Sequence, residues 1–166
     1  GLFTAGYETT AAGISASFHA FASYQEQFQL LREDTSLIAN AAEEILRWET
    51  PVQAILRYSA REVNLSDALV SPGQAVLLLT GASNRDPARY TNPQNIDIRR
   101  EVGDHHAFGG GRHFCLGRSL AKLEMEAVFR EMTERYSQFR QPSNLCRRQN
   151  LQFRSITYLP IELTGH

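Results

Sequence analysis

Apolar residues recur at helical spacing through the first third of the chain. Residues 2–24 carry them around much of the helix circumference, which predicts a buried helix. Gly6 and Gly13 each cost this helix about 1 kcal/mol relative to alanine, so we expect each to have a packing or functional reason. The same spacing predicts helices over residues 26–31 and 37–48.

The pattern then changes from helices to short strands. Pro51 ends the third helix, and residues 54–59 and 75–79 predict strands with a Pro-Gly turn between them. A long irregular region follows over residues 81–112. Structureless loops longer than about 15 residues are usually functional, so this region is a candidate for a site.

A helical face returns after the irregular region, and the chain ends in a strand pattern. The tail of residues 151–163 predicts a strand, because β-branched and aromatic residues are frequent in it. The face that predicts the last helix consists of Leu116, Leu120, Leu123 and Ala127.

Composition and charge narrow the function classes. The 166 residues are 42% hydrophobic, which is enough for one packed unit. The net charge is -1, so no global field would attract nucleic acid. Cys115 and Cys146 cannot build a disulfide framework, and two cysteines suit a reducing cytosol. No signal peptide is recognisable, and no apolar run approaches the roughly 18 residues of a membrane span.

The segment "FGGGRHFCLG" carries the strongest chemical signal, and three common readings of it fail. A dinucleotide fingerprint needs glycine where Phe114 stands. A Walker loop ending at Gly117 lacks both a required glycine and its lysine. A zinc site lacks a second Cys-x-x-Cys or His-x-x-x-His pair. Its four candidate ligands are His105, His106, His113 and Cys115.

What remains is a thiolate in a glycine-lined turn directly before a helix. The helix N-terminus favours a thiolate over a thiol, so Cys115 is a candidate soft metal ligand. Glycines let a large flat ligand approach the backbone, and His113 is placed to donate to the acidic edge of such a ligand. The alternative for Cys115 is a buried, inert thiol.

This motif, F-x-x-G-x-x-x-C-x-G, is matched by Phe108, Gly111, Cys115 and Gly117. With it the chain resembles the haem-thiolate monooxygenases of the cytochrome P-450 family. Three further segments agree with the family in its order: the oxygen-activating "AGYET" (residues 5–9), the E-x-x-R pair in "EILR" (residues 44–47) and the meander-like "NRDPARYTNPQNIDIRR" (residues 84–100).

The resemblance covers nearly all of the chain but well under half of the family's domain. It implies a mainly α-helical fold with small β-sheets, the C-terminal part of the cytochrome P-450 fold. Residues 1–166 would then be the C-terminal portion of a single domain whose N-terminal half is absent. The first helical pattern fits this expectation, because it opens at Gly1 with neither Met nor a capping residue.

The resemblance implies haem b, iron protoporphyrin IX, as cofactor. Cys115 would be the proximal iron ligand, with Phe108 packed beside its sulfur. His113 and Arg57 would pair with haem propionates, although an arginine in a strand can equally be solvated. The other residues implied to contact the cofactor are Ala5, Gly6, Gly109, Gly111 and Gly117.

Glu44, Arg47 and Arg100 match a network that holds the proximal loop in shape and takes no part in catalysis. Glu44 and Arg47 stand three residues apart, and exposed pairs of this kind are commonplace. Such a pair contributes about 0.2–0.5 kcal/mol. The network role therefore comes from the resemblance.

Thr9 and Glu8 match the alcohol and acid that deliver protons during oxygen activation. The alternative for Thr9 is a hydroxyl bonded to the helix carbonyl three or four residues earlier. The resemblance also implies substrate contacts from the central helix, from residues 53–55 and from residues 151–153. The candidates are mostly apolar, which fits a hydrophobic substrate: Leu2, Ala5, Ile55 and Phe153.

The function implied is insertion of one atom of dioxygen into a hydrophobic organic molecule. Electrons would come from a ferredoxin or flavodoxin-type donor, and the chain alone would be inactive. Arg112, Arg118 and Lys122 are a candidate donor patch or simply solvated charges. The histidine form of the motif and "ASNRDP" resemble the soluble bacterial members of the family. This resemblance implies a cytoplasmic location. The alternatives are a catalytically silent haem-binding fragment or pseudo-enzyme, and a peroxide-driven peroxygenase or decarboxylase.

Overall fold

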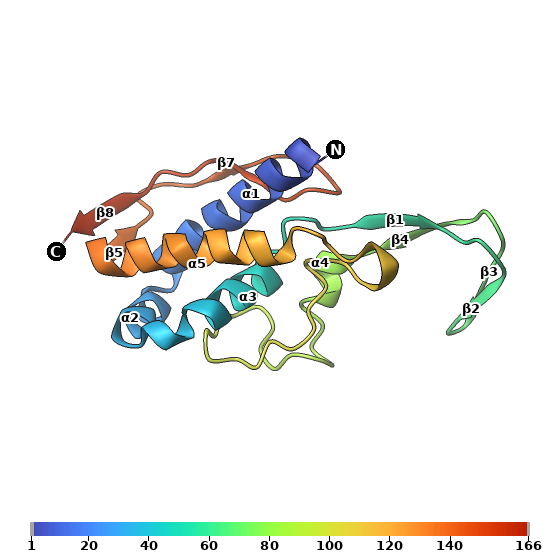
Figure 1. Cartoon of the computed structure of the whole chain (residues 1–166), viewed down its shortest axis with the longest axis horizontal. Coiled ribbons are helices and arrows are strands. Elements are labelled where there is room, and N and C mark those ends of the chain that lie inside the picture. The colour runs from blue at the N-terminus through green and yellow to red at the C-terminus, as the bar shows by residue number, and fades with distance from the viewer. Residues whose placement is uncertain (1, 166) are drawn as a thin grey trace.

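A computed structural model describes residues 2–165, with side chains from residue 5 onwards. Three long helices form its centre, α1 (Leu2–Ser23), α3 (Ile38–Trp48) and α5 (Arg118–Arg135) (Figure 1). The shorter helical elements are α2 (Gln25–Glu33), η1 (Thr35–Leu37), α4 (Thr80–Ser83) and η2 (Gly111–His113).

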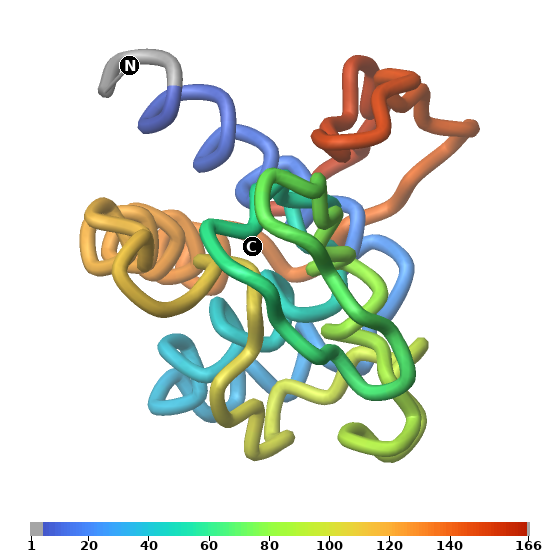
Figure 2. Tube along the Cα trace, turned by 90° about the vertical axis from the view of Figure 1, so that its right-hand side faces the viewer, coloured from blue at the N-terminus to red at the C-terminus, as the bar shows by residue number. Residues whose placement is uncertain are grey.

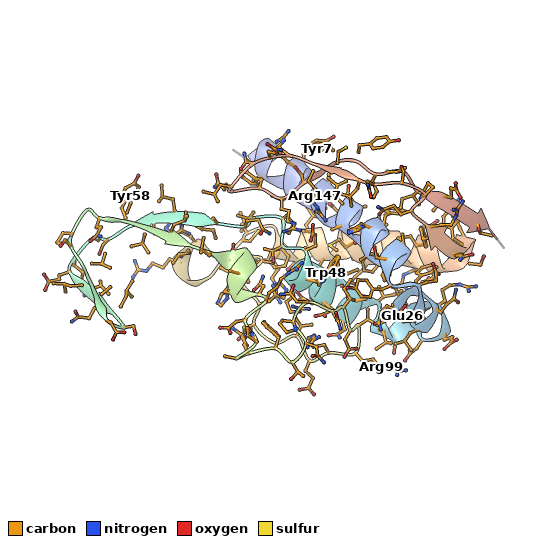
Figure 3. The ribbon with its side chains drawn as sticks, turned by 180° about the vertical axis from the view of Figure 1, so that it is seen from behind. Tyr7, Glu26, Trp48, Tyr58, Arg99 and Arg147 are labelled. Atoms are coloured by element: carbon orange, nitrogen blue, oxygen red, sulfur yellow. The ribbon has the colours of Figure 1, made fainter. Side chains whose placement is uncertain are left out.

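Two-stranded antiparallel sheets lie on two sides of the helices. β1 (Ile55–Tyr58) pairs with β4 (Ala75–Leu78), and β2 (Val63–Leu65) pairs with β3 (Ala68–Val70). These four strands form an arm that projects from the helices (Figure 1). Tyr58 lies out on this arm, whereas Trp48 lies among the helices (Figure 3).

The C-terminal segment forms the other two sheets. β5 (Tyr136–Arg140) pairs with β8 (Glu162–Gly165), and β6 (Cys146–Arg147) pairs with β7 (Ile156–Tyr158). The segment around β6 and β7 and the first turns of α1 rise on the same side of the molecule (Figure 2). β7 therefore contacts α1, whereas the chain ends in β8, which pairs with β5.

An aromatic cluster joins α1, α2, α5 and β5. The ring centroid of Phe21 lies 5.3 Å from those of both Phe28 and Phe129, and Phe28 lies 4.5 Å from Phe139. All four rings are buried. The Phe21–Phe129 and Phe28–Phe139 pairs are edge-to-face, and such pairs add about 0.5–1.5 kcal/mol each beyond the burial of area, so the cluster fixes how these elements pack.

The two glycines of α1 have different surroundings. A Cβ at Gly13 would lie 3.3 Å from Sδ of Met125 and 3.5 Å from Cδ2 of Leu46, so glycine lets α1 approach α5 and α3 closely. A Cβ at Gly6 would meet no atom of the described residues within 4 Å apart from the backbone next to it in its own helix, and Gly6 lines a cavity. The first glycine therefore serves packing and the second leaves a cavity open.

The predicted helices over 2–24, 26–31 and 37–48 are confirmed to within about two residues, as are the strands at 54–59 and 75–79. The continuous strand over 151–163 is wrong. Asn150 Oδ1 accepts from the backbone N–H groups of Gln152 and Phe153, which makes a turn there. Pro160, which has no N–H to donate, then separates β7 from β8.

The predicted helix after Leu116 is confirmed as α5, and the leucines of the predicted face are largely exposed. Leu116, Leu120 and Leu123 are 91%, 61% and 63% exposed. The buried side chains of α5 include Met125 and Phe129 instead, which lie against Gly13 and Phe21 of α1. The helix carries apolar residues on more than one side, so spacing alone did not identify the buried side.

Candidate functional site

A cavity of about 460 Å³ lies between the first half of α1 and the loop that precedes α5. It is bordered by apolar side chains that include Leu46, Val52 and Met125. Most of the residues predicted from the sequence line this cavity: Ala5, Gly6, Glu8, Thr9, Ile55, Phe108, Gly109, His113, Cys115, Gly117 and Phe153.

The loop that carries Cys115 has a backbone that needs glycine. Gly109 and Gly111 have φ values of 72° and 65°, in the left-handed region where a Cβ is strained. The N–H of Cys115 donates to the carbonyl oxygen of Phe108 at 3.0 Å and closes the loop. α5 begins three residues later at Arg118, so Cys115 stands just before the N-terminus of this helix.

The cavity fits a flat group bound through sulfur. Cys115 is exposed and lines the cavity, so its sulfur is accessible to a ligand. Gly6, Gly109 and Gly117 border the same space without side chains, and His113 supplies a hydrogen-bond donor. These residues would hold the haem that the motif implies.

Thr9 and Glu8 line the cavity but already have partners within the protein. The hydroxyl of Thr9 donates to the carbonyl oxygen of Ala5 at 2.6 Å, which is the back-bonded geometry of a threonine within a helix. Arg148, from β6–β7, forms an ion pair with Glu8. The proton-delivery role of both residues remains a prediction.

Three predicted residues lie elsewhere or outside the description. Arg57 is in β1, donates to the carbonyl oxygen of Leu56 and is not among the residues lining the cavity. Gly111 shapes the loop through its positive φ without lining the cavity. The side chain of Leu2 lies outside the described residues.

The Glu44, Arg47 and Arg100 side chains meet beneath the irregular region. Arg100 Nε lies 3.1 Å from Glu44 Oε1, and Glu44 is completely buried. The guanidinium of Arg47 also donates to backbone carbonyl groups of the irregular region. It therefore holds this region in place although the region forms no strands there. These carbonyl groups belong to Asn84, Pro93 and Asn95.

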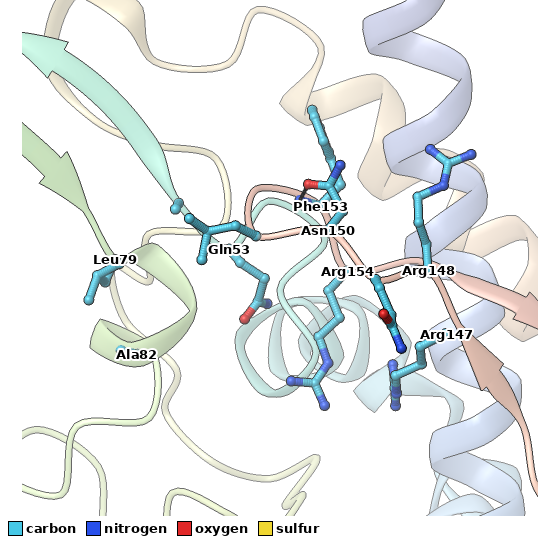
Figure 4. Close-up of a pocket in the computed structure, with 11 residues that line it drawn as sticks. Gln53, Leu79, Ala82, Arg147, Arg148, Asn150, Phe153 and Arg154 are labelled. Carbon is cyan, nitrogen blue, oxygen red and sulfur yellow. Dashed lines mark hydrogen bonds between the residues drawn. The ribbon is translucent and has the colours of Figure 1, made fainter.

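A second charge cluster, around Glu49, was not predicted. Glu49 is 2% exposed and pairs with Arg85, Arg147 and Arg154. Burial lowers the pKa of Arg85, and Glu49 opposes this effect. Arg147 and Arg154 also line a neighbouring cavity of about 490 Å³ (Figure 4). No local signal indicated this cluster, because the two tail arginines follow Glu49 by 98 and 105 residues.

The fold and the position of Cys115 in it agree with what is expected of a haem-thiolate protein. The cytochrome P450 family model matches residues 1–160, and the chain belongs to that family. The predicted fold class is thereby confirmed. Among solved structures, cytochrome P450 CREJ matches with a TM-score of 0.93 and 34% identity over 98% of this chain and 41% of its own.

Two relatives with similar sequences come from bacteria. Cytochrome p450 CYP199A2 of Rhodopseudomonas palustris is 39% identical over 98% of this chain and 40% of its own length. The 6-deoxyerythronolide B hydroxylase of Saccharopolyspora erythraea is 35% identical over 99% of this chain and 41% of its own length. The chain thus spans about two fifths of the length of the relatives it matches.

Two further observations concern membranes and metal clusters. Within the described residues, no helix has both the length and the apolar character needed to cross a membrane. Across the same residues, no three His, Cys, Asp or Glu side chains gather where they could hold a metal ion.

Proposed function

We propose that the chain is the C-terminal portion of a haem-thiolate monooxygenase domain in which Cys115 ligates the iron of haem b. The observation that carries this proposal is the accessible thiol of Cys115 in a cavity that α1 also borders. A thiolate-ligated haem supplies electron density that favours cleavage of dioxygen. Phe108 and His113 would hold the cofactor from the loop, and Gly6 would leave room for it on the side of α1.

The proposed reaction inserts one oxygen atom into a hydrophobic organic substrate. Ile55 and Phe153 supply apolar surface in the cavity, which supports this substrate class. The structural neighbour P450BioI, solved in complex with a hexadec-9Z-enoic acid ligated acyl carrier protein, shows an apolar chain bound to a relative with 37% identity. A ferredoxin or flavodoxin-type donor would supply electrons in the cytoplasm.

The decisive experiment replaces the proposed ligand in the full-length protein. Cys115→Ser should lose the red-shifted ferrous-CO Soret band and substrate oxidation together, because an alkoxide binds iron far more weakly than a thiolate. Cys146→Ser is the matched control, since Cys146 is also a free, exposed cysteine but lies in β6 outside the cavity. A Cys115→Ser protein that keeps the band has another ligand.

A second candidate function is a haem-binding protein without oxygenase activity. The observation in its favour is that both proposed proton carriers are engaged, Thr9 with its own helix and Glu8 with Arg148. Such a protein would show the thiolate band but form no oxidised product with any donor. Product formation together with the band therefore separates the two candidates.

A further inference from the structure

Glu43 gathers hydrogen-bond donors from two segments far along the chain. Its Oε2 lies 2.7 Å from His105 Nε2, and its Oε1 lies 2.8 Å from Arg118 Nη2 and 2.7 Å from Lys122 Nζ. The side chain of Glu43 is 13% exposed and that of His105 is 2% exposed. We call these four residues the Glu43 cluster.

The hydrogen bonds of His105 fix its tautomer. Its Nδ1 accepts from the backbone N–H of Ala107 at 3.1 Å and so cannot carry a proton in this arrangement. Nε2 is therefore the ring nitrogen that donates its proton to Glu43. Ala107 directly precedes Phe108, whose carbonyl oxygen accepts from the N–H of Cys115. Glu43 thus reaches the first end of the Cys115 loop through His105.

The other end of the Cys115 loop is held by the two cations. Arg118 is the first residue of α5, and its guanidinium lies 5.8 Å from the ring centroid of Phe108 and 5.6 Å from that of Phe114. Lys122 follows one turn later. The first turn of α5 carries no acidic residue, although that end of a helix disfavours cations. Glu43 supplies the missing negative charge from α3.

The charges of the cluster do not cancel. One carboxylate, that of Glu43, faces the two cations Arg118 and Lys122, so positive charge remains next to the loop of the proposed ligand. Arg118 is 42% exposed and Lys122 25% exposed, so both also reach the surface. Nε of Arg118 is buried and has no hydrogen-bond partner among the described residues. Arg118 is therefore held by its outer nitrogen and its stacking contacts.

We propose that Glu43 is a positioning residue for Cys115, which holds one end of the loop through His105 and the other end through Arg118 and Lys122. The proposal rests on the proposed haem site. It assigns Glu43 no contact with cofactor or substrate, since Glu43 does not line the cavity. Its effect is on how long the thiolate stays bound to iron.

The test measures thiolate ligation in the full-length holoprotein rather than activity. Glu43→Gln keeps the shape of the side chain but removes the charge that Arg118 and Lys122 need. The variant should still load haem, but its red-shifted ferrous-CO band should decay on the order of tenfold faster, as is typical when a partner that orients a metal ligand is lost. Circular dichroism recorded in parallel must show that the fold persists during the decay.

Two further variants keep the test decisive if Glu43→Gln folds poorly. His105→Phe retains a ring beside Phe108 but removes both hydrogen bonds, and Lys122→Gln removes one exposed cation. Both should shorten the lifetime of the band, His105→Phe more strongly. Glu131→Gln, which breaks an exposed pair with Arg135 on α5, should leave it unchanged.

The outcomes separate this proposal from the proposed function. If the wild-type protein lacks the band, the haem-thiolate assignment itself fails. If the wild-type protein shows the band, and Glu43→Gln and His105→Phe keep its lifetime within about twofold of Glu131→Gln, the positioning role fails and the haem site stands. Faster decay in both variants with an intact fold supports it.

Discussion

Arg47 donates twice to Glu44 one turn earlier in α3, from Nε to Oε2 at 2.7 Å and from Nη2 to Oε1 at 2.9 Å. Neither side chain has any exposed surface. Cζ of Arg47 also lies 5.1 Å from the ring centroid of Tyr90, so this ring in the irregular region covers the guanidinium. The sequence spacing alone resembles a common surface pair, but this pair is entirely buried and therefore costly to break.

Glu44→Ala should lower the free energy of unfolding by about 3–5 kcal/mol, because it leaves Arg47 and Arg100 as buried charges without their carboxylate. Chemical denaturation followed by circular dichroism measures this change, and haem content should fall with it. Glu131→Ala removes an exposed carboxylate and should cost less than about 1 kcal/mol. Equal stability of the two variants would contradict burial of the network.

Thr9→Ala in the full-length protein should keep the haem but divert reducing equivalents from product to peroxide, if Thr9 carries protons. The measurement is product formed per NAD(P)H consumed with redox partners present. Ser15→Ala is the matched control, since Ser15 makes the same bond to the carbonyl four residues earlier, at 2.8 Å, and does not line the cavity. If both variants couple equally well, Thr9 has a structural role.

The Cys115 loop could be predicted from the sequence because its requirements are local. Gly109 and Gly111 adopt positive φ angles that few other residues tolerate, and Cys115 stands at a fixed distance from the start of α5. The helices α1 and α3 could also be predicted from the sequence. Their apolar spacing and the stop at Pro51 depend only on residues close together in the chain.

Features that depend on distant partners could not be predicted. Glu43 meets His105 62 residues away and Arg118 75 residues away, and nothing near Glu43 distinguishes it from a solvated acid. The buried side of α5 could not be predicted from spacing either. Its choice depends on Phe21 and Gly13, which lie about a hundred residues earlier in the chain.

The Glu43 cluster should also make stability depend on acid. Burial raises the pKa of Glu43, but hydrogen bonds from His105 and Lys122 outweigh burial and lower it from 4.5 to about 2. The ionised group therefore stabilises the fold fully above pH 4.5 and loses this effect as the pH falls towards about 2. The free energy of unfolding of Glu43→Gln, measured against pH, should fall less steeply across this window than that of the wild type.

A parallel pH curve for Glu131→Gln should keep the wild-type slope, since its pair with Arg135 is exposed. Identical slopes for wild type and Glu43→Gln would show that the carboxylate of Glu43 gains nothing from its partners. His105→Phe, measured beside Glu43→Gln, shows how much of the slope depends on the hydrogen bonds of His105.

From the exposed leucines at and just before the start of α5 we expect residues 1–166 to self-associate when they are expressed alone. Leu116, Leu120 and Leu123 are all more than half exposed, and Phe114 beside them is 46% exposed. Contiguous apolar surface of this kind promotes association, so the isolated chain should self-associate, bind a hydrophobic dye and lack oxygenase activity. Replacing Leu120 and Leu123 by Gln should reduce association in analytical ultracentrifugation without lowering helix content. A monomeric wild-type chain that binds no dye and oxidises a hydrophobic substrate would contradict this expectation.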